Sequence, residues 1–109
     1  MTRIRAIIKR PDERFGHVAE IGDTLKDLQD IVGGNIETLQ IAASTVMIMN
    51  EEGKLRQDCE PNFFIREAHF ADVICGNVVL LGIAGDDFMD CPIGLACWKK
   101  MLKKWGNMA

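Results

Sequence analysis

Acidic side chains in predicted turns are the first residues of this chain whose chemistry could serve a function. Glu51 and Glu52 lie in the segment Asn50-Glu-Glu-Gly-Lys54, and Asp86 and Asp87 follow an apolar run. Adjacent carboxylates can act as an acid and base pair or bind a divalent cation, but both uses require a pocket that shifts a pKa or supplies further ligands. Solvated turns and helix capping explain these acids more simply. We therefore predict no catalytic residue and no metal site.

Amide side chains and one lysine are better candidates for recognising a small polar ligand. An amide both donates and accepts hydrogen bonds, so it can read a base edge or a phosphate, and a cation beside a loop favours an anion. Turn capping explains the same amides about as well. The candidate ligand-binding residues are Asn50, Glu52, Lys54, Asn62, Asn77, Asp86 and Asp87.

Thiols, imidazoles and paired glycines do not form a recognisable catalytic or cofactor site. No two cysteines have the C-x-x-C spacing of a zinc or redox site, and a cytosol keeps thiols reduced. The two histidines are far apart and have no third metal ligand at a suitable spacing. Gly33-Gly34 follows a predicted helix, whereas phosphate-binding glycines precede one. We predict free thiols and no cofactor; the residues concerned are Cys59, Cys75, Cys91, Cys97, His17 and His69.

Length, charge and hydrophobic content limit the class of protein. A chain of 109 residues with 48% hydrophobic side chains can bury one core, so we predict a single domain over residues 1–109. The net charge of -3 argues against binding along a phosphate backbone, so nucleic acid is not an expected partner. No apolar run approaches the roughly 20 residues that span a bilayer, and the N-terminus lacks signal-peptide features. We expect a cytoplasmic protein without membrane contact.

A predicted helix that begins after Asp23 or Thr24 and ends at Gly33-Gly34 organises the chain. The two polar residues can cap the first helical turn, and the glycines can adopt the left-handed conformation of a C-cap. Apolar residues recur three to four positions apart on one face; they are Leu25, Leu28, Ile31 and Val32.

Strands are predicted on both sides of this helix. Residues 3–9 alternate between apolar and mainly basic side chains, and residues 15–21 form their partner in a hairpin. Residues 36–41 and 46–49 are β-favouring or continuously apolar. The segment from Asn50 to Lys54 has the composition of a hairpin loop, so a return strand is expected from Leu55.

The second half of the chain predicts a long loop followed by apolar strands. Pro61 cannot donate to a sheet, so residues 57–72 are expected to form a loop with its aromatic residues tucked onto the sheet. Residues 72–84 are the most apolar segment, and they predict a central strand or two strands joined by a bend at Gly76-Asn77.

A final helix is predicted after a turn at Gly85 and a short helical turn at Phe88-Met89, with Pro92 in its first turn. Its apolar side is expected to pack on the sheet and its lysines to form a solvated cationic face, with a contact to DNA as the alternative. The apolar residues are Ile93, Cys97, Trp98, Met101, Leu102 and Trp105, and the lysines are Lys99, Lys100, Lys103 and Lys104.

These segments together resemble a known family, the short phage and Firmicute proteins described as domain of unknown function 3846. The segments that carry the resemblance are residues 22–37, 50–55, 61–62 and 72–82 and the Asp87-Phe88 pair. The resemblance covers most of the chain. It implies a protein of prophages or conjugative elements and implies no particular biochemical activity.

We predict an α+β fold with a mainly antiparallel sheet of about five strands, one helix on a face and the C-terminal helix docked beside it. Apolar residues in short segments predict a homo-oligomer; these are Met47, Met49, Phe63 and Phe64.

Two functions are compatible with these features of the sequence. The first is a non-enzymatic binding protein of a phage or mobile element, an anti-defence protein that sequesters a nucleotide-type signal or blocks a host defence component. The turn from Asn50 to Lys54 and the Pro61 loop are then expected to line a shared pocket. The alternative is a small hydrolase or transferase, which requires Glu52 and Asp86 or Asp87 in one cleft.

Overall fold

The computed structural model describes residues 3–53 and 58–107. Its elements follow one another along the chain as β1 (Arg3–Lys9), β2 (His17–Gly22), α1 (Leu25–Val32), β3 (Ile36–Ala42), β4 (Thr45–Asn50), β5 (Pro61–Glu67), β6 (Phe70–Cys75), β7 (Val78–Ala84), β8 (Asp87–Met89) and α2 (Leu95–Lys104).

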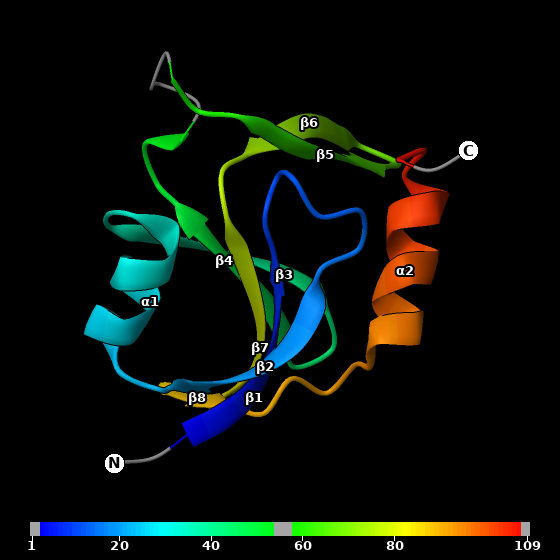
Figure 1. Ribbon diagram of the computed structural model, residues 1–109. Helices are drawn as coiled ribbons and strands as arrows, with labels where there is room; N and C mark the ends of the chain where they lie inside the picture. The colour runs from blue at the N-terminus through cyan, green and yellow to red at the C-terminus, as the bar shows by residue number, and fades with distance from the viewer. Residues whose placement is uncertain (1–2, 54–57, 108–109) are drawn as a thin grey trace.

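The strands form two antiparallel sheets, and the two helices flank the larger one (Figure 1). The main sheet has six strands in the order β2-β1-β7-β4-β3, with β8 paired to β7. The second sheet is the hairpin β5–β6. The predicted α+β class is confirmed, and so are the hairpin β1–β2 and the bend that separates β6 from β7.

Strands β4 and β7 pair with each other at the centre of the main sheet and are buried on both faces. Every residue of Thr45–Met49 and of Val78–Gly82 is buried. Successive side chains belong to two different hydrophobic clusters, because neighbouring residues of a strand point to opposite faces. A strand covered on both sides has a continuous apolar sequence, which explains the two apolar runs.

Helix α1 covers one face of the main sheet. The Thr24 hydroxyl accepts a hydrogen bond from Asp27 N at 3.1 Å, and the Asp27 carboxylate accepts one from Thr24 N at 3.2 Å, so the helix begins with a capping box. The Thr24 hydroxyl also donates to Asp27 Oδ2 at 2.6 Å, and this bond, together with the one from Thr24 N, lowers the pKa of Asp27. The helix ends at Gly33, which has a φ of 80°. Leu28 and Val32 are buried against the sheet and Ile31 packs beside them, which confirms the predicted helix. Leu25, which was predicted on the same apolar face, is 53% exposed.

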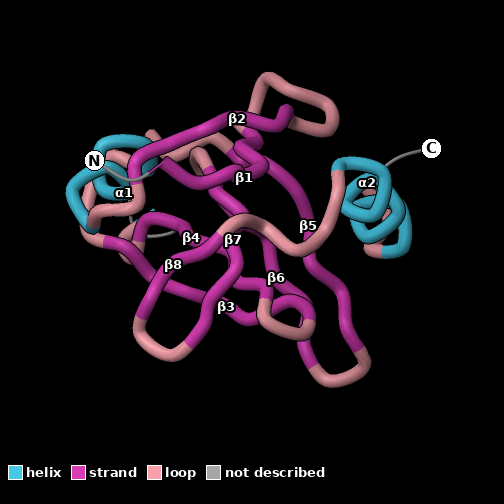
Figure 2. Tube along the Cα trace, turned by 90° about the horizontal axis from the view of Figure 1, so that it is seen from below, coloured by secondary structure: helices cyan, strands magenta, loops and turns pink. Residues whose placement is uncertain are grey.

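The hairpin β5–β6 and helix α2 cover the other face. Figure 2 shows α1 and α2 on opposite sides of the strands, and Figure 1 shows the hairpin across one end of the main sheet. The prediction of a long loop over residues 57–72 is wrong. Pro61 is the first residue of β5, a position that tolerates the missing N–H. The following side chains of the strand alternate between the core and solvent: Phe63 and Ile65 are buried, and Phe64 and Arg66 are exposed.

Three aromatic rings join the hairpin to α2. The Phe63 ring lies 5.4 Å from Trp98 in an edge-to-face contact and 6.1 Å from Trp105 in a stacked contact, measured between centroids. Both indole N–H groups are satisfied: Trp98 donates to Phe15 O at 2.9 Å, and Trp105 donates to Glu67 Oε1 at 3.0 Å. The prediction that the tryptophans pack the helix onto the sheet is confirmed.

The segment before α2 differs from its prediction. Phe88-Met89 belongs to strand β8 and does not form a helical turn, because a turn at Gly85 folds the chain back antiparallel to β7. The chain then continues beside β1, where Cys91 N donates to Arg5 O at 2.8 Å. Pro92 precedes the helix, whose N-cap is Gly94.

The apolar residues that suggested a homo-oligomer are mostly not on the surface. Met47, Met49 and Phe63 lie in the core, and only Phe64 of the four is exposed. The prediction of a homo-oligomer therefore loses most of its original basis, although the outer face of the hairpin exposes Phe64 together with Phe70 and Val73.

The alternation of buried and exposed side chains in β5 predicts effects of very different size on stability for two neighbouring phenylalanines. Phe63→Ala should lower the free energy of unfolding by about 3 to 5 kcal/mol, because it leaves a cavity beside both tryptophans. Phe64→Ala, the matched control on the exposed face, should change it by less than about 0.5 kcal/mol. Urea denaturation in dilute solution, where self-association does not contribute, measures both; equal losses would contradict the strand assignment.

Candidate functional site

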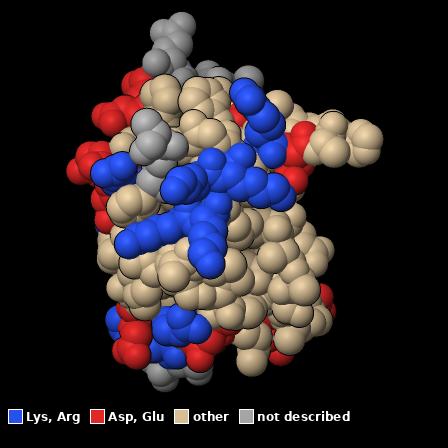
Figure 3. All heavy atoms as spheres, turned by 90° about the vertical axis from the view of Figure 1, so that its right-hand side faces the viewer, with Lys and Arg blue, Asp and Glu red and all other residues tan. Residues whose placement is uncertain are grey.

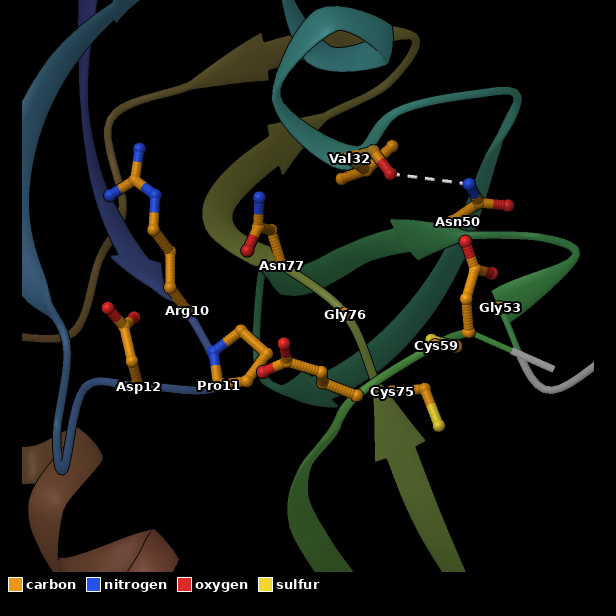
Figure 4. Close-up of a pocket in the computed structure, with 12 residues that line it drawn as sticks. Arg10, Pro11, Asp12, Val32, Asn50, Gly53, Cys59, Cys75, Gly76 and Asn77 are labelled. Carbon is orange, nitrogen blue, oxygen red and sulfur yellow. Dashed lines mark hydrogen bonds between the residues drawn. The ribbon is translucent and has the colours of Figure 1, made fainter. Parts of the chain in front are cut away.

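A hollow of about 410 Å³ opens where α1 ends, and we call it the α1 pocket. Figure 4 shows Arg10 and Asp12 on one side, Val32 and Asn50 on the opposite side, and Gly76 and Asn77 between them. The segment after β4 and the chain that enters β5 complete the wall. The lining residues are Arg10, Pro11, Asp12, Val32, Asn50, Gly53, Asp58, Cys59, Glu60, Cys75, Gly76 and Asn77.

Two of the predicted ligand-binding residues cap the C-terminal end of α1. Asn50 Nδ2 donates to Val32 O at 3.2 Å, and Asn77 Nδ2 donates to Ile31 O at 3.1 Å. The last carbonyls of a helix have no partner within it, so these amides satisfy groups that would otherwise face the pocket. Asn50 Oδ1 also accepts from Glu52 N at 2.8 Å. Among the described residues no donor reaches Asn77 Oδ1, which lies on the side of the pocket that faces Arg10 (Figure 4).

The pocket has mixed charge with a negative excess. Arg10 is a cation of the wall, whereas Asp12, Asp58 and Glu60 are carboxylates. The Arg10 guanidinium lies 3.7 Å from Glu13, which neutralises part of its charge. Such a surface accepts hydrogen bonds from a ligand at several points, and it disfavours a ligand that carries several negative charges.

The backbone comes close to a thiol at the base of the pocket. Gly76 has a φ of +78°, a conformation that side-chain-bearing residues rarely adopt, and a Cβ there would lie 3.5 Å from Cys59 Sγ. Gly76 N donates to Glu60 O at 2.8 Å, which ties the link between β6 and β7 to the start of β5. Neither Cys59 nor Cys75 forms a disulfide, and neither histidine is among the residues that line the pocket, so the pocket wall offers these thiols no imidazole base.

Asn62 is a connector between three segments. Its Nδ2 donates to Lys9 O at 2.9 Å and to Gly76 O at 2.7 Å, and its Oδ1 accepts from the Lys9 ammonium at 2.5 Å. Lys9 is only 3% exposed, and its burial lowers its pKa, an effect that the charges of Glu13 and Asp12 partly offset. The amide of Asn62 thus joins β1, β5 and the link before β7.

The structure brings together only some of the predicted ligand-binding residues. Asn50 and Asn77 line the α1 pocket, together with Gly53 and with Asp58, Cys59 and Glu60 from the segment before Pro61, so the turn and this segment do share a hollow. Asn62 lines a different hollow, and Asp86 and Asp87 line a third. Glu52 lies in an exposed turn, and Lys54 and the return strand predicted from Leu55 fall outside the described residues.

The carboxylates of the hydrolase or transferase alternative lie near opposite ends of β7. Because β4 and β7 are antiparallel, Glu52 follows the end of β4 that lies near the start of β7, whereas Asp86 and Asp87 follow the other end of β7. Asp87 belongs to β8, so it does not cap a helix either. Both edges of β4 are occupied by β3 and β7, so the turn after Asn50 does not close a hairpin within the main sheet.

Sequence reasoning missed the charged residues of the pocket. Arg10 and Asp12 flank Pro11, and Glu60 precedes Pro61. Proline in a sheet protein marks a strand end, and charged residues beside it are exposed at the edge of the fold. The prolines therefore mark these charged residues as exposed at strand ends, but the sequence does not show that Pro11 and Pro61 line the same hollow in the fold.

The described part of the chain holds neither a metal-binding cluster nor a membrane-spanning helix. Within residues 3–53 and 58–107, no group of three or more His, Cys, Asp or Glu side chains is arranged to hold a metal ion. In the same residues, neither helix has the length and apolar content needed to cross a bilayer.

Comparison with known protein families gives a match over most of the chain. The model of the family described as "Domain of unknown function (DUF3846)" matches residues 4–103, which is nearly the whole chain. No curated protein and no solved structure matches the chain.

The contact between Lys9 and Asn62 predicts a strong energetic coupling. Asn62→Ala should lower the free energy of unfolding by about 3 kcal/mol or more, because it leaves a buried ammonium without its acceptor and two carbonyls without donors. In a Lys9→Met background the same change should cost at least about 1 kcal/mol less. Urea denaturation of the four proteins measures the coupling.

The exposed amide Asn35 provides the control for this cycle. Its side chain contacts Gln29 and Glu51 at the surface, so Asn35→Ala should cost less than about 1 kcal/mol and show no coupling to Lys9→Met. Additive effects of Lys9→Met and Asn62→Ala would contradict the role assigned to Asn62.

Proposed function

The chain belongs to the family described as domain of unknown function (DUF3846), and from this premise we propose that it is a non-enzymatic small binding protein of a phage or mobile element. The single observation that carries the proposal is the α1 pocket. It is the place where the capped end of α1 meets four other segments of the chain around a hollow of about 410 Å³.

The chemistry of the pocket favours a ligand with one anionic group and several hydrogen-bond donors. Arg10 supplies donors for one phosphate or carboxylate, and Glu60 and the side-chain oxygen of Asn77 supply acceptors. Val32 and Pro11 add apolar surface for a flat ring. A purine or pyrimidine nucleoside monophosphate or a cyclic nucleotide meets this description, whereas the charge of a triphosphate conflicts with three carboxylates.

A binding role without catalysis is consistent with the thiols and amides that line the pocket. The thiols have no neighbouring imidazole, and Asn50 and Asn77 use their N–H groups to cap α1. In this proposal the protein acts in the cytosol of the host as an anti-defence protein. It sequesters a nucleotide-type signal, or, with the same surface, blocks a host defence component.

Calorimetric titration against a panel of linear and cyclic nucleotides tests the proposal. We expect heat with at least one monophosphate or cyclic nucleotide and weaker binding of the corresponding triphosphate. Arg10→Gln and Glu60→Gln should each weaken binding roughly tenfold, because each removes a charge-assisted hydrogen bond.

Arg66→Gln is the matched control for this titration. Arg66 is exposed on the hairpin β5–β6, and its loss changes the net charge by the same amount as Arg10→Gln without altering the α1 pocket. The absence of heat with every nucleotide, together with no host partner in pull-down experiments, would refute the proposal.

We also propose that the protein forms a homo-oligomer, now through the outer face of the hairpin. Phe64 and Val73 are directly paired across β5 and β6, and they are 53% and 37% exposed. Sedimentation velocity should show an assembly larger than a monomer. Replacing both residues by serine should convert it to a monomer, while Leu25→Ser, which removes an equally exposed apolar side chain on α1, should not.

A further inference from the structure

A second hollow, of about 290 Å³, lies on the other side of Pro11 from the α1 pocket. Its wall contains Lys9 together with Asn62 and Phe63, the two residues that the Lys9 ammonium contacts. Arg14 also belongs to the wall. We call this hollow the Lys9 pocket.

Lys9 is a buried cation without a carboxylate partner among the described residues. Its ammonium donates to the neutral amide oxygen of Asn62 and lies 5.7 Å from the centroid of the Phe63 ring. An ammonium has three N–H donors, and the Asn62 carbonyl oxygen at 3.5 Å takes a second one only weakly. A buried charge normally has a direct counter-ion, because a neutral acceptor and a ring do not offset the loss of hydration. The charges of Glu13 and Asp12 offset this loss only in part, so the pKa of Lys9 stays lowered.

The one carboxylate of the wall is already engaged. Glu13 Oε2 lies 2.7 Å from His17 Nδ1, and Glu13 Oε1 accepts from Arg10 N at 3.1 Å. Burial alone would raise the pKa of Glu13, but the hydrogen bonds from His17 and Arg10 outweigh it and lower the pKa. Glu13 therefore stays ionised with its carboxylate hydrogen-bonded to His17 and Arg10, so it is not the direct partner of the Lys9 ammonium.

Further positive charge lies beside the pocket. The Arg14 guanidinium and the Lys99 ammonium both lie against the Phe15 ring, 5.1 Å and 4.6 Å from its centroid. Figure 3 shows lysine and arginine side chains gathered over α2 on this side of the molecule. The residues of this cationic strip are Arg14, Lys99, Lys100, Lys103 and Lys104.

The C-terminal end of α2 also borders the pocket, and its carbonyls would repel an anion if they were free. They are not all free: Asn107 N and Nδ2 both donate to Leu102 O, at 3.1 Å and 3.0 Å, and Gly106 N donates to Lys103 O at 3.0 Å. The cap reduces the negative potential that the helix presents at this point.

We infer that the Lys9 pocket is a binding site for a small oxyanion, a phosphate group in particular, which the Lys9 ammonium and the Arg14 guanidinium hold together. The phosphate is the counter-ion that the buried ammonium lacks. The cationic strip raises the local concentration of anions and guides them to the pocket. This site is distinct from the α1 pocket and does not depend on the function proposed for it.

Titration of the intact protein with inorganic phosphate at constant ionic strength tests the inference. The pKa of Lys9, followed by the NMR shifts of its side-chain carbon and nitrogen against pH, should rise with phosphate toward its ordinary value near 10.5. Arg14→Gln should weaken phosphate binding roughly tenfold, because Arg14 is exposed and its loss removes one charged donor without disturbing the core. Lys9→Met should abolish binding.

A control variant separates a built site from general attraction. Arg66→Gln removes an exposed cation of the hairpin that lies outside the Lys9 pocket, so it should not change phosphate affinity by more than about twofold. A Lys9 pKa that does not respond to phosphate, or a response confined to the lysines of α2, would overturn the inference. Loss of nucleotide binding at the α1 pocket would not affect it.

Discussion

Strands β4 and β7 have no polar face, and the rest of the structure is arranged to cover them. Their side chains alternate between two hydrophobic clusters, so each face of the main sheet must be shielded from water. Helix α1 packs on one face only, where Leu28 and Val32 join one of the two clusters. The other face is covered by two elements that do not pack against α1, the hairpin β5–β6 and helix α2, which meet at Phe63, Trp98 and Trp105. The eight-residue helix α1 therefore shields one face of the main sheet, and the hairpin β5–β6 and helix α2, which follow β4 in the chain, shield the other.

Both hollows described here form where these covers end. A cover that is shorter than the sheet leaves backbone groups without partners at its ends, and burial of such groups is unfavourable unless a side chain pairs with them. Asparagines do this at three points. Asn50 and Asn77 pair with carbonyls at the end of α1, and Asn62 pairs with β1 and with the link before β7. The amides hold segments together across a gap, and the gap between the segments is the pocket.

The parts of the fold that follow from local signals were predictable, and the parts that follow from distant partners were not. Helix α1 has its cap residues, its apolar face and its terminal glycine within the 23–34 segment, so its sequence alone defines it. Strand β8 has no such signal, because three residues become a strand only by pairing with β7. The hairpin β5–β6 is hard to predict for another reason: Pro61 is a strong signal against a strand, whereas the alternation of Phe63, Phe64 and Ile65 that follows it is short. The α1 pocket draws on five separated segments, so the amides could be named from the sequence while Arg10 and Glu60 could not.

Net charge was the least informative property, because it is a sum over surfaces of opposite sign. The value of -3 for the whole chain combines an α2 segment that has four lysines and no acid with an α1 pocket that has three carboxylates and one arginine. The two hollows on either side of Pro11 therefore differ in the ligands that they favour. Hydrogen-bond donors and a single anionic group suit the α1 pocket, and a phosphate suits the Lys9 pocket. A ligand long enough to cross Pro11 would bind in one orientation only, with its most anionic end at Lys9, because the reverse orientation would place that end against Asp12, Asp58 and Glu60.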